Sequence, residues 1–465
     1  MLFNSYVFIF LFWPVTLIVY FALNRFRYTD VSKYWLALSS LFFYGWWNVK
    51  YIPLLLGSIV FNYMIGRLLT SKDDTHTTHK RRRKLILTFG IIMNLLLLGY
   101  YKYADFFLDN LNHLTGGNIP MLHIILPLGI SFFTFTQIAY LVDGYRGKAQ
   151  EYNFFSYILF VTFYPHLIAG PILHHSEMMP QFDRIRNKIL NWSNLSRGMY
   201  VFCIGLIKKV VIADTFAVFA NDGFNSATGF IDSWVAALSY TFQLYFDFSG
   251  YTDMAIGVAL CFNIKLPENF NSPYKAVNLQ DFWRRWHMTL SRFLRDYIYI
   301  PLGGNRRGDA IAMRNVIITF LIGGLWHGAG WTFMIWGALH GVGQAIHRLW
   351  AKLGRPLPIW AAWFITFIFI NITWVFFRST SWGQALRILK GMSGLNGAGL
   401  HSPLTLFIPI IMIAIFLPIV LFTPNSTQRR EQMNPDWKTA FTMAVMFVLS
   451  LLYLNRISEF LYFNF

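Results

Sequence analysis

The stretch GGLWHGAGW at residues 323–331 places one histidine, His327, between two tryptophans and four glycines, with long apolar runs on both sides. A neutral imidazole tolerates burial and remains available as a base near neutral pH. Gly328 and Gly330 would let a ligand or another backbone segment approach it closely. The alternative is a hydrogen-bonded core histidine, the commoner role of a lone histidine. That alternative is stronger for His340, which lies mid-helix, and His166 is undecided.

Carboxylates are the groups that could orient such a base, but none lies nearby in the sequence. No Asp or Glu occurs between Met313 and Trp350, so an orienting carboxylate must come from another segment. The three options are Asp247, Asp253 and Asp296. Two of them lie within the apolar stretch FQLYFDFSGYTDMAIG (242–257), where an uncompensated charge is costly. The alternative is therefore a structural pair with a buried Arg or Lys.

The segment 278–308 combines aromatic and basic residues in a pattern that could bind a polyanion. Helical spacing of Trp283, Trp286, Phe293 and Tyr297 predicts an interfacial helix whose other face is basic. One interpretation is a membrane-surface helix held by anionic lipid. The other is a docking surface for a donor such as coenzyme A, since Arg binds phosphate bidentately and Trp can stack on adenine. The predicted donor-binding residues are Trp283, Arg284, Arg285, Trp286 and Arg295.

Motifs of other catalytic chemistries are missing from the sequence. There is no GxSxG, P-loop or HExxH motif, and the two cysteines, Cys203 and Cys261, lie in apolar segments with no CxxC spacing. A covalent acyl-enzyme is therefore unsupported, no metal is expected, and direct transfer between two substrates fits better.

The composition indicates the elements that must hold these residues. Of the 465 residues, 55% are hydrophobic and only 13% are charged, about half the usual share in soluble domains. The net charge of +18 does not indicate nucleic acid, because the basic residues are spread over short loops between apolar runs. We therefore expect an all-α, multi-pass membrane protein forming a single domain over residues 1–465. The expected apolar runs are 6–23, 34–47, 52–69, 85–101, 121–142, 153–170, 199–218, 234–263, 315–327, 331–350, 358–377, 404–423 and 438–455.

The loop charges predict how these runs cross the membrane. The basic stretch 71–84 marks the cytoplasmic side, which places 103–120 outside and the basic segment 265–314 inside. The alternation is kept only if 153–180 enters and returns on one side, as a re-entrant segment whose YPHLIAGP supplies the Pro and Gly. His327 would then lie ~20 Å above Arg314, deep in the bilayer.

Two long stretches resemble the membrane-bound O-acyltransferase family. They are NFNSPYKAVNLQDFWRRWHMTLSRFLRDYIYIPLGGNRRG (269–308) and GGLWHGAGWTFMIWGALHG (323–341), and segments 126–147, 163–182 and 243–257 match in the same order. The resemblance is greatest to the bacterial polysaccharide branch, which acetylates alginate and peptidoglycan. It implies a helical bundle of about 11–13 membrane segments in the bacterial cytoplasmic (inner) membrane. It also implies that an acyl group crosses the membrane through the protein, and that the family's two histidines correspond to His327 and His287.

The resemblance favours one of three hypotheses for the function of this protein. The first is transfer of acetyl from cytoplasmic acetyl-CoA to a polysaccharide, or to a periplasmic partner transferase, with His327 as the base. The second is D-alanyl transfer to teichoic acid from a carrier protein. The third is a non-enzymatic transporter, whose solute flux would survive loss of His327. Membrane lipid is an expected partner in all three, and nucleic acid in none.

Overall fold

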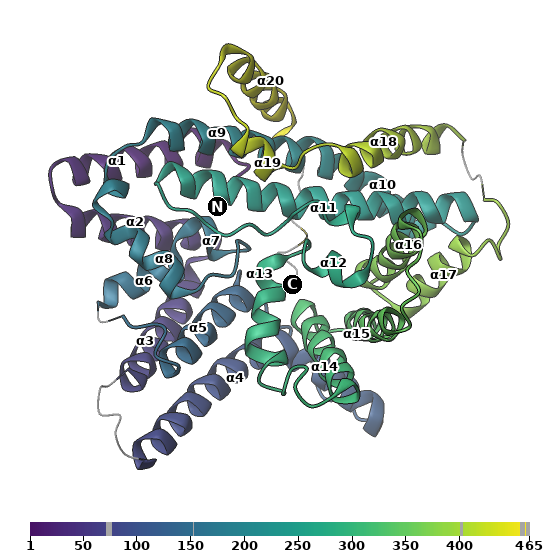
Figure 1. Cartoon of the computed structure of the whole chain (residues 1–465), viewed down its shortest axis with the longest axis horizontal. Helices are drawn as coiled ribbons and strands as arrows, with labels where there is room; N and C mark the ends of the chain where they lie inside the picture. The colour runs from purple at the N-terminus through teal and green to yellow at the C-terminus, as the bar shows by residue number, and fades with distance from the viewer. Residues whose placement is uncertain (71–76, 152, 400–402, 456–460, 462–465) are drawn as a thin grey trace. The chain divides into compact units, whose positions relative to one another are not determined.

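The computed structural model describes residues 1–70, 77–151, 153–399, 403–455 and 461. Over these residues the chain forms helices and no strand (Figure 1), as the composition predicts. It groups into two compact units. The first unit comprises Met1–Phe202 and Thr252–Pro267, and the second comprises Cys203–Tyr251 and Glu268–Phe463. The expectation of a single domain stays a prediction.

The helices are mostly those that the apolar runs predict. The first unit contains η1 (Phe8–Phe12), α1 (Trp13–Arg25), α2 (Thr29–Gly45), η2 (Val49–Tyr51), α3 (Ile52–Leu69), α4 (Thr77–Thr115), α5 (Ile130–Tyr145), α6 (Phe154–Thr162), α7 (Tyr164–Leu167), α8 (His175–Asp183) and η3 (Ile185–Lys188). Two helices have residues in both units, α9 (Trp192–Ile207) and α11 (Phe230–Cys261). The second unit contains η4 (Lys208–Ala213), α10 (Asp214–Ser226), η5 (Pro273–Lys275), α12 (Leu279–Trp283), α13 (Met288–Leu294), η6 (Arg295–Tyr299), α14 (Asp309–His327), α15 (Trp331–Lys352), α16 (Ile359–Arg378), α17 (Trp382–Met392), α18 (Pro403–Phe422), α19 (Ser426–Glu431) and α20 (Trp437–Tyr453).

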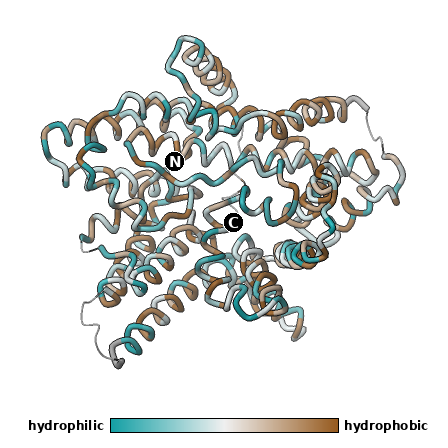
Figure 2. Tube along the Cα trace, viewed as in Figure 1, coloured by the Kyte–Doolittle hydropathy of each residue, from teal (hydrophilic) through white to brown (hydrophobic). Residues whose placement is uncertain are grey.

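Several of these helices can cross a bilayer. Among the described residues, five are long and apolar enough, namely Phe8–Arg25, Val49–Leu69, Lys80–Thr115, Asp309–His327 and Ile359–Arg378. The helices Leu406–Phe422 and Trp437–Tyr453 are apolar but shorter. Figure 2 shows the hydrophobic residues following these helices, with a hydrophilic N-terminal end on α4. The chain is therefore a multi-pass membrane protein.

The segment expected to enter and return contains only short helices. α6 has nine residues, or ~14 Å of helix, which is about half of a bilayer core. It ends at Thr162, and the four-residue α7 follows. The backbone here is buried in protein: Tyr164 N–H donates to Ser40 Oγ, and the carbonyl of Phe160 accepts from His166 Nε2 at 2.9 Å. His166, undecided from sequence, is therefore bonded to a backbone carbonyl.

The polar stretch 103–120, which the loop charges place outside, is helical as far as Thr115, and its side of the membrane stays a prediction. α4 continues through it to Thr115, where Gly116 takes a positive φ of 67°. The residues before that point include no Pro and no Gly after Gly99, so nothing stops the helix earlier.

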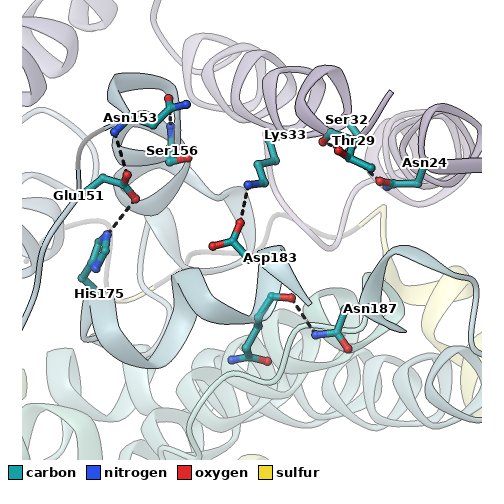
Figure 3. A network of polar contacts seen from close by, with 11 residues as sticks. Asn24, Thr29, Ser32, Lys33, Glu151, Asn153, Ser156, His175, Asp183 and Asn187 are labelled. Carbon is teal, nitrogen blue, oxygen red and sulfur yellow. Dashed lines mark hydrogen bonds and ion pairs between the residues drawn. The ribbon is translucent and has the colours of Figure 1, made fainter. Parts of the chain in front are cut away.

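Polar contacts fix the helices of the first unit to one another. Asn62 on α3 and Asn94 on α4 exchange side-chain amide hydrogen bonds of 3.0 and 2.7 Å. Figure 3 shows Lys33 of α2 paired with Asp183 of α8 at 2.6 Å, and His175 paired with Glu151 at 3.2 Å. The Asn62–Asn94 pair is buried in an apolar setting, where such a pair specifies which helices meet.

Close packing of α14 against α15 positions the residues around His327. A Cβ built on Gly337 would collide with the carbonyl oxygen of Phe320, and one on Gly341 would lie 2.8 Å from the Cα of Ile317. The obstacles are backbone atoms on the facing helix, which cannot rotate away. Glycine thus lets the two backbones touch, as small residues do at membrane helix interfaces.

This packing predicts opposite effects for two Gly→Ala substitutions in the second unit. We expect Gly337→Ala to destabilise the protein by about 1–3 kcal/mol, because its methyl group has no space. Gly383→Ala on α17 meets nothing within 4 Å and should stabilise by about 0.5–1 kcal/mol through helix propensity. Thermal unfolding in detergent would measure both. Equal effects would contradict the packing account.

Candidate active site

Three buried histidines of the second unit are connected by tryptophan rings. The ring centroids of His287 and Trp326 are 6.2 Å apart, and those of Trp326 and His327 are 5.0 Å apart. Beyond them, Trp336 lies 5.1 Å from His327 and 4.8 Å from His340. We call these five residues the histidine–tryptophan cluster. It brings together the two histidines that the sequence singles out for catalysis.

His327 is the last residue of α14 and is 2% exposed. Trp336 of α15 and Phe377 of α16 both place their rings 5.1 Å from its imidazole, edge to face. The chain then turns through Gly328, where any Cβ would overlap the ring of Phe333. The imidazole therefore lies against a wall of buried aromatic rings.

His287 lies where the chain breaks between α12 and α13. Its backbone is left-handed, with φ 42° and ψ 54°, and its side chain is fully buried. Nδ1 is 3.1 Å from Oδ1 of Asn269, and the ring of Phe248 is 4.8 Å away. Burial lowers the pKa of His287 from 6.5 to about 3, so the ring is neutral near neutral pH. A buried residue held in this strained conformation is typical of functional positions.

His340 has the structural role that its mid-helix position predicts. The indole Nε1–H of Trp283 donates to its Nδ1 at 3.1 Å, and the side chain is fully buried. Because an indole nitrogen only donates, Nδ1 must accept, and the neutral ring carries its proton on Nε2. This contact joins α12 to α15 at the cluster.

The single interfacial helix predicted over 278–308 is wrong. Two short helices, α12 and α13, replace it, because the chain turns at residues 284–287 and His287 leaves the helical conformation. Trp283 and Trp286 are buried among other aromatic rings, with Trp286 stacked on Phe282. Helical spacing did not reveal this break, since the turn contains no Gly or Pro.

The predicted donor-binding arginines lie at the edge of this segment. Arg284 is exposed, Arg285 pairs with Asp281 at 2.8 Å, and Arg295 pairs with Asp296 at 2.7 Å. Arg295 remains 62% exposed in its side chain. Their part in donor binding, like that of Trp283 and Trp286, stays a prediction.

The carboxylates proposed to orient His327 occupy different places. Asp247 pairs with Lys209 at 2.7 Å, which is the structural alternative considered from sequence. Asp296 pairs with Arg295, and Asp253 lies in the part of α11 that belongs to the first unit. An orienting role for any of the three stays a prediction. Among the residues that the structure describes, no group of three His, Cys, Asp or Glu could hold a metal.

A separate cavity of about 790 Å³ lies between α15 and α16 of the second unit. Its walls are mainly apolar, with Ile346, Phe369 and Ile365 among them, and its polar side chains are Asn278, His347, Arg355 and Thr366. None of the histidines of the cluster lines it. This cavity is therefore not the predicted catalytic position.

Sequence reasoning missed two residues of the site, Asn269 and Phe377. Asn269 contacts His287 across 18 positions, and Phe377 contacts His327 from α16. Asn269 stands in the stretch that carries the family resemblance, but nothing in its spacing links it to His287. Only the left-handed turn at His287 brings the two together.

Comparison with known proteins shows what this chain is similar to. A model of the membrane-bound O-acyltransferase family matches residues 46–382, which include the whole histidine–tryptophan cluster. A peptidoglycan O-acetyltransferase of Helicobacter pylori is 47% identical over all of this chain and 98% of its own length. A probable alginate O-acetylase of Pseudomonas putida is 40% identical over the full length of both chains. A teichoic acid D-alanyltransferase of Streptococcus thermophilus is 28% identical over 50% of this chain and 59% of its own length.

Proposed function

Since the chain belongs to the membrane-bound O-acyltransferase family, we propose that it transfers acetyl from acetyl-CoA to a hydroxyl of a peptidoglycan- or alginate-type polysaccharide. The observation that carries this proposal is the full-length similarity to two proteins named for O-acetylation, at 47% and 40% identity. The D-alanyltransferase covers only half of the chain, at 28% identity. Acetyl transfer is therefore favoured over D-alanyl transfer.

The geometry suggests how the residues act. His327 Nε2 or Nδ1 would take the proton of the polysaccharide hydroxyl, whose oxygen then attacks the thioester carbonyl. The new C–O bond forms, the C–S bond breaks, and the proton ends on the sulfur of coenzyme A. The rings of Trp326, Trp336 and Phe377 would limit hydrolysis by excluding water.

The direction of transfer is the second part of the proposal. Basic residues are concentrated between 265 and 314, the segment assigned to the cytoplasmic side, where acetyl-CoA is made available. The acceptor polysaccharide lies on the other side of the membrane. The acetyl group would thus cross through the protein, either to the polysaccharide directly or to a periplasmic partner transferase.

A donor test distinguishes acetyl from D-alanyl transfer. Purified protein in lipid bilayers should release free coenzyme A from acetyl-CoA when an acetylatable glycan is added, and should not discharge a D-alanyl carrier protein. If turnover requires a periplasmic extract as well, the acetyl route through a partner is supported. Discharge of the carrier alone, with acetyl-CoA untouched, would contradict the proposal.

A further inference from the structure

The amide of Asn269 accepts three hydrogen bonds at one oxygen. Oδ1 lies 3.1 Å from His287 Nδ1, 3.2 Å from the backbone nitrogen of Thr289 and 3.0 Å from Thr289 Oγ1. All three residues are buried, and Asn269 is fully so. The backbone adds a bond from Met288 N–H to the carbonyl of Asn269, at 3.0 Å. The turn at His287 is therefore built around this asparagine.

The backbone of Thr289 determines which way the amide faces. A peptide N–H can only donate, so the atom that it meets must be the amide oxygen and not the nitrogen. Without such a contact, the side-chain amide of an asparagine could be rotated by 180°, because its oxygen and nitrogen occupy nearly the same space. Here the reversed amide would place an NH₂ group against a peptide N–H, leaving both without an acceptor in a buried site.

The tautomer of His287 follows from that orientation. An amide oxygen accepts and cannot donate, so Nδ1 must carry the proton that bridges to it. In the neutral ring Nε2 then has a lone pair and no hydrogen. Nε2 is buried and has no hydrogen-bond partner among the described residues. In contact with His287 are the rings of Phe248 and Trp326 and the side chain of Asn269, none of them charged.

We infer that Asn269 is a positioning residue that fixes His287 as the Nδ1–H tautomer, so that His287 meets its substrate only as a hydrogen-bond or proton acceptor at Nε2. The identity of the substrate rests on the proposed function, whereas the tautomer rests on the hydrogen bonds alone. The tautomer limits what His287 can do in catalysis. A thioester carbonyl needs a donor to stabilise its developing negative charge. In this tautomer Nε2 of His287 has no hydrogen to donate, so the group that binds at Nε2 must be an O–H or N–H group.

Nitrogen NMR of the full-length protein in lipid tests the tautomer without any turnover. Histidine is labelled with ¹⁵N, and the signals of His287 are identified by their loss in His287→Gln. The wild type should show a protonated Nδ1 and an unprotonated Nε2 throughout the neutral pH range. In Asn269→Ala the constraint is lost, and a protonated Nε2 should appear.

Two further variants control for structural damage. Asn371→Ala removes another buried asparagine of the same unit, one whose Oδ1 accepts from Thr241 at 2.7 Å. It should reduce thermal stability and leave the signals of His287 unchanged. Asn269→Asp keeps an acceptor at the same position but adds negative charge, which favours the doubly protonated ring. Its Nε2 should become protonated at a much higher pH than in the wild type.

Kinetics give the corresponding readout once turnover is measured. A positioned base contributes roughly 10²–10⁴ in rate, so we expect Asn269→Ala to reduce kcat by about tenfold or more, with little change in KM for acetyl-CoA. Asn269→Asp should regain activity at high pH and lose it on the acid side, as Nε2 becomes protonated. A pH profile parallel to the wild type would contradict this role.

The inference is overturned if wild-type His287 carries its proton on Nε2, or if Asn269→Ala leaves the tautomer unchanged. Absence of acetyl transfer in every variant would instead refute the proposed function, and the NMR result would still stand. The two failures are therefore distinguishable.

Discussion

Replacing His327 by alanine is expected to reduce acetyl-CoA turnover by roughly 10²–10⁴, the usual contribution of a positioned general base. The imidazole is buried in an aromatic wall at the end of α14, so no neighbouring side chain in that wall could take the hydroxyl proton in its place. Release of free coenzyme A by purified protein in lipid measures the loss. The effect should fall on kcat, because the base acts on the reacting hydroxyl.

The matched control for this variant is His113→Ala on α4. That histidine is 79% exposed in its side chain and should be dispensable for turnover. Both variants should elute as folded protein and unfold at similar temperatures. Full activity in a folded His327→Ala protein would return His327 to the alternative of a core histidine. Continued solute flux by that variant would support the transporter.

Replacing Lys209 by methionine is expected to destabilise the protein by about 3–5 kcal/mol, the cost of leaving buried charge uncompensated. Its ammonium lies 2.8 Å from Asp214 and 2.7 Å from Asp247, and the side chains of all three are at most 7% exposed. Without the cation, two carboxylates remain close together in an apolar region. Denaturation of the purified protein in mixed micelles would measure the loss.

Two variants show whether burial is the cause. Lys33→Met breaks a pair in which Asp183 is 67% exposed, and such pairs contribute only about 0–1 kcal/mol. Combining Lys209→Met with Asp214→Asn and Asp247→Asn removes all three charges and should recover much of the lost stability. Equal losses for Lys209→Met and Lys33→Met would contradict the account of a buried triad.

The sequence predicts the helices well because membrane segments are defined by long apolar runs. The α14–α15 hairpin, with His327 buried at the end of α14, was expected from the two apolar runs on either side of the Gly-rich stretch. His340 as a core residue followed from its mid-helix position. Asp247 illustrates the limit: its burial could be predicted, but its partner Lys209 lies 38 positions away on another element, and spacing cannot pair them.

Features that depend on tertiary contacts were not predictable. The break at residues 284–287 has no Gly or Pro, and it exists because the left-handed turn at His287 lets two successive N–H groups bond to Asn269. α4 continues to Thr115, beyond the apolar run 85–101, because the polar residues that follow are compatible with a helix. Asn269 was missed because only the turn at His287 brings it to that histidine.

The most direct test of acetyl transfer across the membrane uses sealed vesicles containing the protein. Acetyl-CoA labelled in its acetyl group is supplied outside, and a glycan acceptor, with the periplasmic partner if required, is enclosed within. The account predicts labelled glycan inside vesicles that contain the wild type and none with His327→Ala. Label appearing only on glycan placed on the same side as acetyl-CoA, or equally with both proteins, would contradict it.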